Sequence, residues 1–367
     1  MNRNISRRSL LNGIAMVEPP KIEYRTLGKT GLKLSSVGFG CMITSDASVI
    51  DRSLDLGINY FDTARDYQGG NNERLLGAAV KSRRNKVYIS TKTAALEPQE
   101  AVEDLETSLK TLGTDYVDIW LLHDRSRASE VSPELIEAML SAKKQGKVRF
   151  IGVSTHRNQA QVIPAVVANG QFDVAMVTYN FAMDAAKTLP PIQMARKAGL
   201  GVIGMKVLAG SFRLDPSTYD RARAIMRKPG AGLSALKWAL NGGVVDVAIP
   251  GMIDMDQLEE NMRAMSEPFG NADGQMLASY IERYGSMYCR MCGGCEGTCT
   301  KGLPVPDVQR VLAYADGYKQ FPLARERYLR LAGDAGLERC DCSSCSVKCT
   351  FGVNVAARVR RAQRLLA

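Results

Sequence analysis

Four polar residues stand at or just beyond the ends of short apolar runs, and together they could transfer a proton to or from an oxygen atom. They are an acid, a phenol, an amine and an imidazole: Asp62, Tyr67, Lys92 and His123. A free tyrosine has a pKa of about 10 and is a weak acid at neutral pH. An ammonium beside Tyr67 would lower that pKa, a carboxylate would keep the ammonium charged, and the imidazole could orient a substrate oxygen. The set therefore predicts acid–base chemistry on a carbonyl or an alcohol.

A second group of residues suited to chemistry lies near the C-terminus, where eight of the nine cysteines follow one another closely. They form two runs, Cys289, Cys292, Cys295 and Cys299, then Cys340, Cys342, Cys345 and Cys349. The first run has the C-x₂-C-x₂-C-x₃-C spacing of bacterial ferredoxins, in which the fourth cysteine binds the other cluster. This indicates one [4Fe–4S] cluster on Cys289, Cys292, Cys295 and Cys349, and a second on Cys299, Cys340, Cys342 and Cys345.

The two runs repeat with an offset of fifty residues, except that Cys340 stands one position beyond the expected place. Threonines, Thr300 and Thr350, also replace the proline that usually follows each run. Both departures bear on whether the second cluster is complete. Two Cys₄ zinc sites would use the same ligands and are the alternative.

The elements that must position the first group alternate between short apolar runs and amphipathic segments. The predicted strands are Ser36–Gly40, Asn59–Asp62, Val87–Thr91, Val117–Leu122, Arg149–Ser154, Val174–Thr178, Val202–Lys206 and Val245–Ile249. Predicted helices include Glu100–Leu112, Pro133–Gln145 and Asp256–Met265. Eight such units predict an α/β fold, a (β/α)₈ TIM barrel, whose chemistry gathers at the carboxyl ends of the strands. A doubly wound sheet is disfavoured because no G-x-G-x-x-G follows the first strand.

Beyond the barrel the pattern changes to helices that alternate with the cysteine runs. These helices are predicted at Gly274–Tyr284, Asp307–Tyr318, Leu323–Leu331 and Val355–Leu366. We therefore expect three parts: an N-terminal extension or degenerate twin-arginine leader at 1–20, the barrel at 21–270, and a small α-helical, ferredoxin-like iron–sulfur domain at 271–367. The last part could cover some of the barrel mouth.

Several segments resemble the aldo-keto reductase family. The matching stretches are 25–32, 61–67 with 72–77, and 105–118 leading to His123. The whole chain resembles the subgroup that carries a ferredoxin-like tail. The resemblance implies Tyr67 as the acid/base, with Asp62, Lys92 and His123 around it. It also implies NAD(P) as cofactor, bound through Ser154, Thr155, Met205, Lys206, Gly251, Gln257, Glu260 and Asn261. The glutamine usual in the family is replaced by Met176 and the stacking aromatic by Met205, and the choice between NAD and NADP stays open.

Three functions remain in competition. The first is an oxidoreductase that interconverts an aldehyde, ketone or sugar-like carbonyl with an alcohol, its clusters being structural or redox-sensing. The second is an iron–sulfur electron-transfer oxidoreductase that works through a partner protein or another cofactor. The third is a non-catalytic, redox-sensing module that binds a nicotinamide.

Composition narrows the partners and the compartment. The formal charge is +10, but the basic residues are spread along the chain and do not alternate with aromatic residues as in a nucleic-acid interface. No apolar run is long enough for a membrane span. Ser6–Leu11 contains twin arginines, followed by a short apolar stretch and Pro19–Pro20 rather than a cleavage site. We expect a small-molecule substrate and a cytoplasmic location, with twin-arginine export to the periplasm as the alternative.

Overall fold

A computed structural model describes residues 21–209, 230–287, 289–318, 320–335, 337 and 340–367. Its centre is a parallel eight-stranded sheet in which the strands follow chain order. The strands are β3 (Phe39–Gly40), β4 (Tyr60–Asp62), β5 (Tyr88–Thr93), β6 (Val117–Leu122), β7 (Val148–Thr155), β8 (Val174–Thr178), β9 (Gly201–Met205) and β10 (Val247–Ala248). All eight predicted strands are present, with ends shifted by up to three residues.

The first and last strands meet, so the sheet closes into a barrel. Isolated parallel bridges join Val37 to Ala248 and Gly40 to Gly251, and backbone hydrogen bonds of 2.9 Å run in both directions between residues 36–38 and Ala248. The predicted first strand, Ser36–Gly40, is shorter in the structure because its first half pairs only through this closure. The prediction of a (β/α)₈-type barrel is confirmed.

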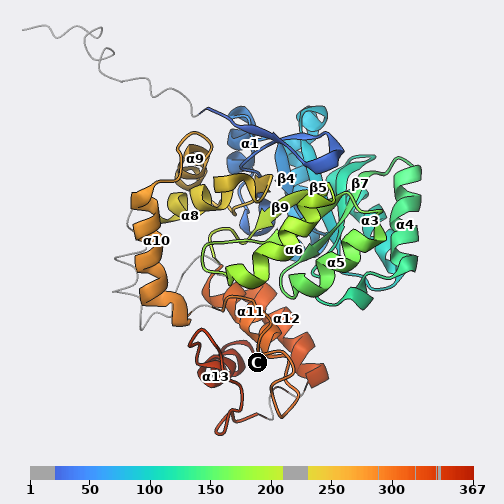
Figure 1. Cartoon of the computed structure of the whole chain (residues 1–367). Helices are drawn as coiled ribbons and strands as arrows, with labels where there is room; N and C mark the ends of the chain where they lie inside the picture. Colours follow the sequence, from blue (N-terminus) through green and yellow to red (C-terminus); the bar gives the residue numbers. More distant parts are fainter. Residues whose placement is uncertain (1–20, 210–229, 288, 319, 336, 338–339) are drawn as a thin grey trace, which may run out of the picture.

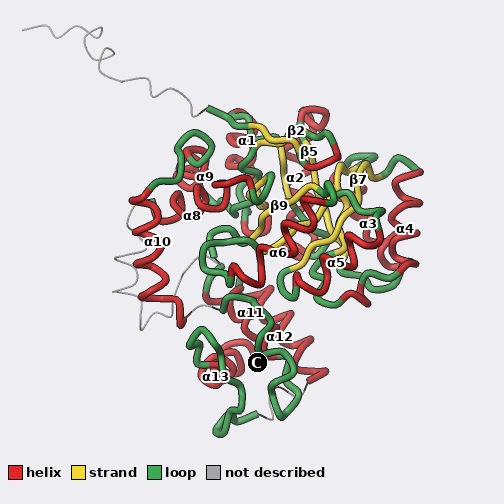
Figure 2. Tube along the Cα trace, viewed as in Figure 1, coloured by secondary structure: helices red, strands yellow, loops and turns green. Residues whose placement is uncertain are grey.

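Helices surround the sheet (Figures 1 and 2). They are α1 (Ala47–Asp55), α2 (Asn71–Val80), α3 (Pro98–Leu112), α4 (Pro133–Lys144), α5 (Gln159–Asn169), α6 (Ala185–Lys197), α8 (Ala231–Leu240) and α9 (Met255–Arg263). Their buried faces form one large apolar core against the outside of the strands. Strands covered on both faces are mostly apolar, which is why the runs in the sequence do not alternate regularly.

The amino-terminal end of the barrel is closed by a hairpin, whereas the carboxyl-terminal end is open. The hairpin of β1 (Tyr24–Thr26) and β2 (Lys33–Ser35) brings Leu27 and Leu34 into the core inside the barrel, with Ile119, Ile203 and other strand residues. Leu27 packs beside Gly201, at the start of β9, where a Cβ would lie 2.4 Å from the leucine. The open mouth is therefore at the carboxyl ends of the strands.

The C-terminal part forms its own core beneath the mouth in the view of Figure 1. Helix α10 (Asn271–Tyr284) packs on α8, while α11 (Val305–Asp316), α12 (Phe321–Ala335) and α13 (Val355–Leu366) pack on one another. Their core includes Val308, Leu312 and Tyr328, together with Cys340 and Cys342. We call residues 289–367 the tail. All three of its predicted helices are present: α13 has the predicted ends, α11 begins and ends two residues earlier than predicted, and α12 is longer at both ends.

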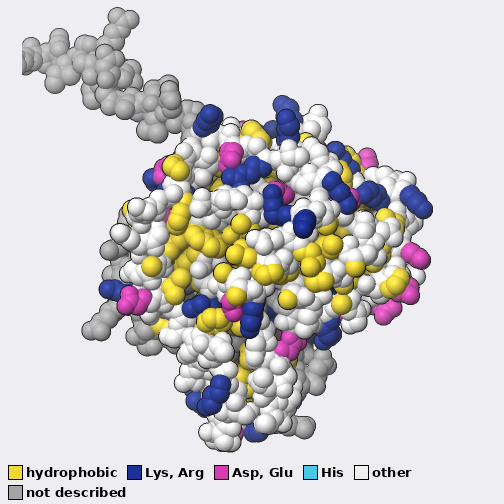
Figure 3. Space-filling view, in the orientation of Figure 1, with side chains coloured by type: hydrophobic (Ala, Val, Ile, Leu, Met, Phe, Trp, Pro, Cys, Tyr) yellow, Lys and Arg dark blue, Asp and Glu magenta, His cyan; other side chains and the backbone are white. Residues whose placement is uncertain are grey.

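Charged side chains are scattered over the face seen in Figure 3, around a band of hydrophobic ones. No single basic patch dominates this face, in keeping with the spread of basic residues along the sequence. No helix among the described residues is long and apolar enough to cross a bilayer.

Candidate active site at the barrel mouth

The ends of β4 and β5 bring a buried ion pair to the mouth. Nζ of Lys92 lies 2.7 Å from Oδ2 of Asp62 and donates a second hydrogen bond, of 2.6 Å, to the carbonyl of Thr63. Ser90 donates to the other oxygen of Asp62 at 2.6 Å. The Lys92 side chain is 1% exposed. Because both charges are paired and hydrogen-bonded, the carboxylate and the ammonium are held in one orientation.

Tyr67 lies beside this pair because the chain turns sharply after β4. A 3₁₀ turn covers Tyr67–Gly70, and Gln68 takes a left-handed conformation with φ of 53°. The Tyr67 oxygen is 3.4 Å from Nζ of Lys92. Burial, reinforced by the charge of Asp62 and then of Asp66, raises the pKa of Tyr67 well above its usual range. The expected lowering of this pKa by Lys92 is therefore wrong for the free protein.

His123 completes the group from the end of β6. Its ring stands edge-on to the Tyr67 ring, with centroids 5.7 Å apart. Its Nδ1 faces Oδ1 of Asp66 at 3.5 Å. Burial lowers the pKa of His123, while Asp66 acts in the opposite direction. His156 is also buried, with its ring 6.3 Å from that of His123.

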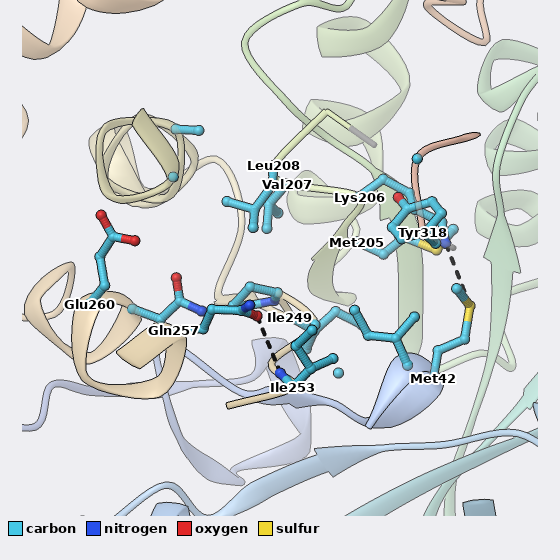
Figure 4. A pocket seen from close by; sticks show the side chains of 18 of the residues that line it. Met42, Met205, Lys206, Val207, Leu208, Ile249, Ile253, Gln257, Glu260 and Tyr318 are labelled. Atoms are coloured by element: carbon cyan, nitrogen blue, oxygen red, sulfur yellow. Dashed lines mark hydrogen bonds between the residues drawn. The ribbon is translucent and has the colours of Figure 1, made fainter. Parts of the chain in front are cut away.

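A cavity of about 630 Å³ opens beside these residues, large enough for a cofactor or a drug-sized ligand. Asp62 and Tyr67 line it, and the wall continues between β9 and α9 (Figure 4). Six of the eight residues predicted to bind the cofactor line this cavity: Met205, Lys206, Gly251, Gln257, Glu260 and Asn261.

The other two predicted cofactor residues are not among those that line the cavity. Ser154 accepts a hydrogen bond of 3.2 Å from the backbone of Asp124. The Thr155 hydroxyl donates to the carbonyl of Arg157 at 2.8 Å. Both hydroxyls thus hold the loops that follow β6 and β7. Met176, at the place where the family has glutamine, is fully buried in the core inside the barrel.

Lys206 enters the cavity from a left-handed backbone position with φ of 56°. Its Nζ lies 4.8 Å from the centre of the Tyr318 ring and 3.9 Å from the sulfur of Met42 (Figure 4). No carboxylate within the described part of the chain is close enough to form an ion pair with it. Burial, with a smaller effect from Lys92, lowers the pKa of Lys206 to about 7.

The tail supplies residues to the mouth that the sequence did not point to. Arg310 of α11 pairs with Asp124, which follows β6, and Arg327 of α12 pairs with Asp66. From the barrel side, Arg157 pairs with Asp307 of α11 at 2.8 Å. The expectation that the tail covers part of the mouth agrees with these contacts. In the sequence, Arg310 and Tyr314 lie four residues apart on a predicted helix, which is a weak indication of functional residues there. No feature of the sequence indicated Arg327.

The cysteines of the tail gather in two places. Cys299, Cys340, Cys342 and Cys345 line one small hollow, and the sulfurs of Cys340 and Cys342 are 3.1 Å apart. The other four cysteines influence one another's pKa values. The pKa of Cys289 is raised to about 12, mainly by burial and also by the charges of Cys295 and Cys292. The charge of Cys349 in turn raises the pKa of Cys295. No described group of three or more His, Cys, Asp or Glu residues is arranged to hold a single metal ion. Each of the nine cysteines lies outside any disulfide, and Cys41 is packed in the barrel core.

A closed parallel barrel with a buried acid, amine, phenol and imidazole at the carboxyl ends of its strands defines a class of barrel oxidoreductases. The sequence model of the Aldo/keto reductase family matches residues 44–282. The chain belongs to that family and is an NAD(P)-dependent oxidoreductase.

Its relatives match over the barrel. The chain is 28% identical to L-galactose dehydrogenase of Arabidopsis thaliana, over 67% of this chain and 89% of the relative. It is 35% identical to the oxidoreductase YqkF of Bacillus subtilis, over 65% of this chain and 90% of the relative. The solved holo form of an aldo-keto reductase from Bacillus halodurans superposes with a TM-score of 0.60 at 27% identity, covering 71% of this chain and 96% of that one.

Proposed function

We propose that the enzyme interconverts a small carbonyl compound and its alcohol, with Tyr67 as the acid/base. The observation that carries this proposal is the distance of 3.4 Å between the Tyr67 oxygen and Nζ of Lys92, at the edge of the cavity. A phenol that loses its proton there becomes a phenolate next to an ammonium. Because Asp62 and Thr63 hold that ammonium, it is in place before the charge develops.

Bound nicotinamide would supply or accept the hydride. In the reducing direction the Tyr67 hydroxyl then gives its proton to the carbonyl oxygen as the oxygen becomes an alkoxide. The raised pKa of Tyr67 keeps the phenol protonated until that moment. In the oxidising direction the phenolate takes the proton back. His123, edge-on to the phenol, is suited to orient the substrate oxygen.

The cavity fits a nicotinamide dinucleotide. Gly251 forms part of its wall and packs closely on Ile43, since a Cβ at this position would lie 2.8 Å from the Ile43 side chain. Met205 at the end of β9 offers a thioether that can pack on a ring, and Lys206 offers a cation toward a phosphate. The far end of the cofactor cavity would be lined by Gln257, Glu260 and Asn261 of α9. The contribution of Ser154 and Thr155 would be indirect, through the loops that their hydroxyls hold. Glu260, whose carboxylate accepts from the backbone of Gly230 at 3.0 Å, disfavours an additional phosphate nearby.

We further propose that the tail holds two [4Fe–4S] clusters, one on Cys289, Cys292, Cys295 and Cys349, the other on Cys299, Cys340, Cys342 and Cys345. Eight thiols that lie in two groups are a suitable donor set, since iron–sulfur clusters bind four thiolates each. Cations stand nearby: the charge of Arg358 acts on Cys289, and Arg360 donates to the carbonyl of Cys342 at 3.1 Å. Such cations would offset the charge of the thiolates.

A structural or sensing role for the clusters is the simplest. A hydride carries two electrons and such a cluster normally passes one, so direct coupling would need a converter. The direct pairing of Arg310 and Arg327 with barrel residues favours a tail that shapes the mouth. An electron-transferring enzyme with a partner protein and a nicotinamide sensor remain the competing functions. A nicotinamide enzyme would find its cofactor in the cytoplasm, which is the location we propose.

The test uses anaerobically purified full-length protein, a panel of aldehydes, ketones and aldoses, and NADH or NADPH. We expect oxidation of the nicotinamide that depends on the carbonyl compound and is lost in Tyr67→Phe. Turnover that survives this substitution would exclude Tyr67 as the acid. Bleaching of the cluster absorbance by the nicotinamide alone would favour electron transfer, and binding without turnover of any substrate would favour a sensor.

A further inference from the structure

A chain of contacts runs from the tail into the active site. The guanidinium of Arg327, on α12, contacts Oδ2 of Asp66. The other oxygen of Asp66 faces Nδ1 of His123 at 3.5 Å. Asp66 immediately precedes Tyr67, so the carboxylate that contacts the tail is attached to the turn that carries the phenol.

The contact between His123 and Asp66 is buried at both of its atoms. Nδ1 of His123 and Oδ1 of Asp66 are both buried, and within the described part of the chain neither has a shorter hydrogen-bond partner. The Asp66 side chain as a whole remains 32% exposed. A carboxylate with this much access to water could turn outward, away from the imidazole. Arg327 contacts the other oxygen of the same carboxylate.

We propose that Arg327 is a positioning residue of the active site, which acts by holding Asp66 against His123. This inference rests on the proposed function for its consequence in turnover, but not for its geometry. The tail would then complete the active site as well as cover it. Asp66 and Arg327 lie 261 positions apart in the chain and come from its two different parts.

The position of Asp66 decides which nitrogen of His123 carries a proton. A carboxylate opposite Nδ1 favours the proton on that atom. Nε2 then offers a lone pair to a substrate hydroxyl when the ring is neutral, and an N–H to a carbonyl oxygen when the ring is charged. If Asp66 turned away, the imidazole would lose both its preferred tautomer and its orientation.

Several ionisable groups surround His123, and the test must separate them. From the barrel these are Asp66, Tyr67, Lys92, Asp124 and His156, and from the tail Arg327. Asp66 raises the pKa of His123, whereas Lys92 and Arg327 lower it. A variant that lacks Arg327 therefore has two opposite possible effects. Loss of a nearby cation alone raises the pKa of His123, but loss of a correctly placed Asp66 lowers it.

The chain contains only two histidines, His123 and His156, so the sign can be read directly. Untagged protein labelled with ¹³C in the histidine rings gives two signals that are titrated by NMR. Asp66→Asn is the reference for a missing carboxylate and is expected to lower the pKa of His123. Arg327→Gln should change that pKa in the same direction, and Arg327→Lys should keep it close to that of the wild type. A rise, or no change, in Arg327→Gln would overturn the proposal, and so would a fall in Arg327→Lys as large as that in Arg327→Gln.

Two further measurements keep the inference separate from the proposed function. The first is a control for loosening of the tail: Arg361→Gln breaks a 2.7 Å ion pair with Asp316 inside the tail. This variant should leave the pKa of His123 unchanged. A fall in the pKa of His123 as large as that in Arg327→Gln would overturn the proposal. In turnover, Arg327→Gln and Asp66→Asn should each lower kcat about tenfold or more, as misplaced catalytic groups do, and the double variant should be no worse. If Tyr67→Phe retains full turnover, the proposed function fails, yet the NMR titration still decides the role of Arg327.

Discussion

Nζ of Lys92 lies 2.7 Å from Oδ2 of Asp62, at the centre of the barrel mouth, and both side chains are almost completely buried. Two opposite charges out of water are stable only as long as both are present. The pair therefore forms a rigid part of the active site, and the Tyr67 oxygen lies beside its ammonium.

Lys92→Met should destabilise the barrel by about 3–5 kcal/mol, because it leaves Asp62 buried without its cation. The change is measured as a shift of the barrel unfolding transition in urea. The double variant Asp62→Asn with Lys92→Met should recover much of the loss. Strictly additive losses would show that the two residues are not coupled.

Tyr67→Phe should lower kcat for carbonyl reduction by about 10²–10⁴-fold, the usual contribution of a positioned acid. The affinity for the nicotinamide should hardly change, since in the proposed mechanism the phenol oxygen contacts the substrate carbonyl. Rapid kinetics and a fluorescence titration of the cofactor separate the two. Loss of cofactor binding together with turnover would point to a binding role for Tyr67.

The reduction should resist high pH. Since the pKa of Tyr67 is raised by burial and by Asp62, the phenol stays protonated as the pH passes the usual tyrosine value of about 10. We expect kcat for reduction to stay level from pH 7 to about 10, measured at saturating cofactor. A decline in kcat that begins near pH 8 and disappears on replacing Tyr67 would contradict the raised pKa.

Cofactor affinity should instead weaken as the pH rises through neutrality. Lys206 has a pKa lowered to about 7 by its burial, so its ammonium is present below that pH and is lost above it. If that cation holds a cofactor phosphate, the Kd for NAD(P)H should increase between pH 6 and pH 8. Lys206→Met should bind weakly at both pH values and show no such increase. An unchanged pH dependence in the variant would assign it to another group.

Removing one cysteine of the second group should remove one cluster. Cys342→Ala is expected to lower the iron and sulfide content of anaerobically purified protein by about half, because [4Fe–4S] clusters need four protein ligands. Cys41→Ala is the matched control, since Cys41 is packed in the barrel core, far along the chain from both runs. Zinc in place of iron in the wild-type protein would reject the clusters altogether.

Much of the barrel could be predicted from the sequence. Strands β6 and β8 have the predicted ends, because short, mostly apolar runs bounded by polar turns leave few other choices. The ends of β3 and β10 could not be predicted, because their pairing depends on closure of the sheet between residues far apart in the chain. Asp62, Tyr67, Lys92 and His123 were predictable as a group because parallel strands bring their carboxyl ends to one edge.

The sequence by itself determined the types of chemistry present: a phenol, an amine, an acid and an imidazole at strand ends, and eight cysteines in two runs. Only the tertiary structure decided the environment of these groups. The pKa of Tyr67 is raised, not lowered, because burial and two carboxylates outweigh the opposing charge of Arg327. This balance depends on distances that no spacing in the chain reveals. The contact of Arg327 with Asp66 likewise exists only because the packing of α12 over the mouth joins two distant parts of the chain.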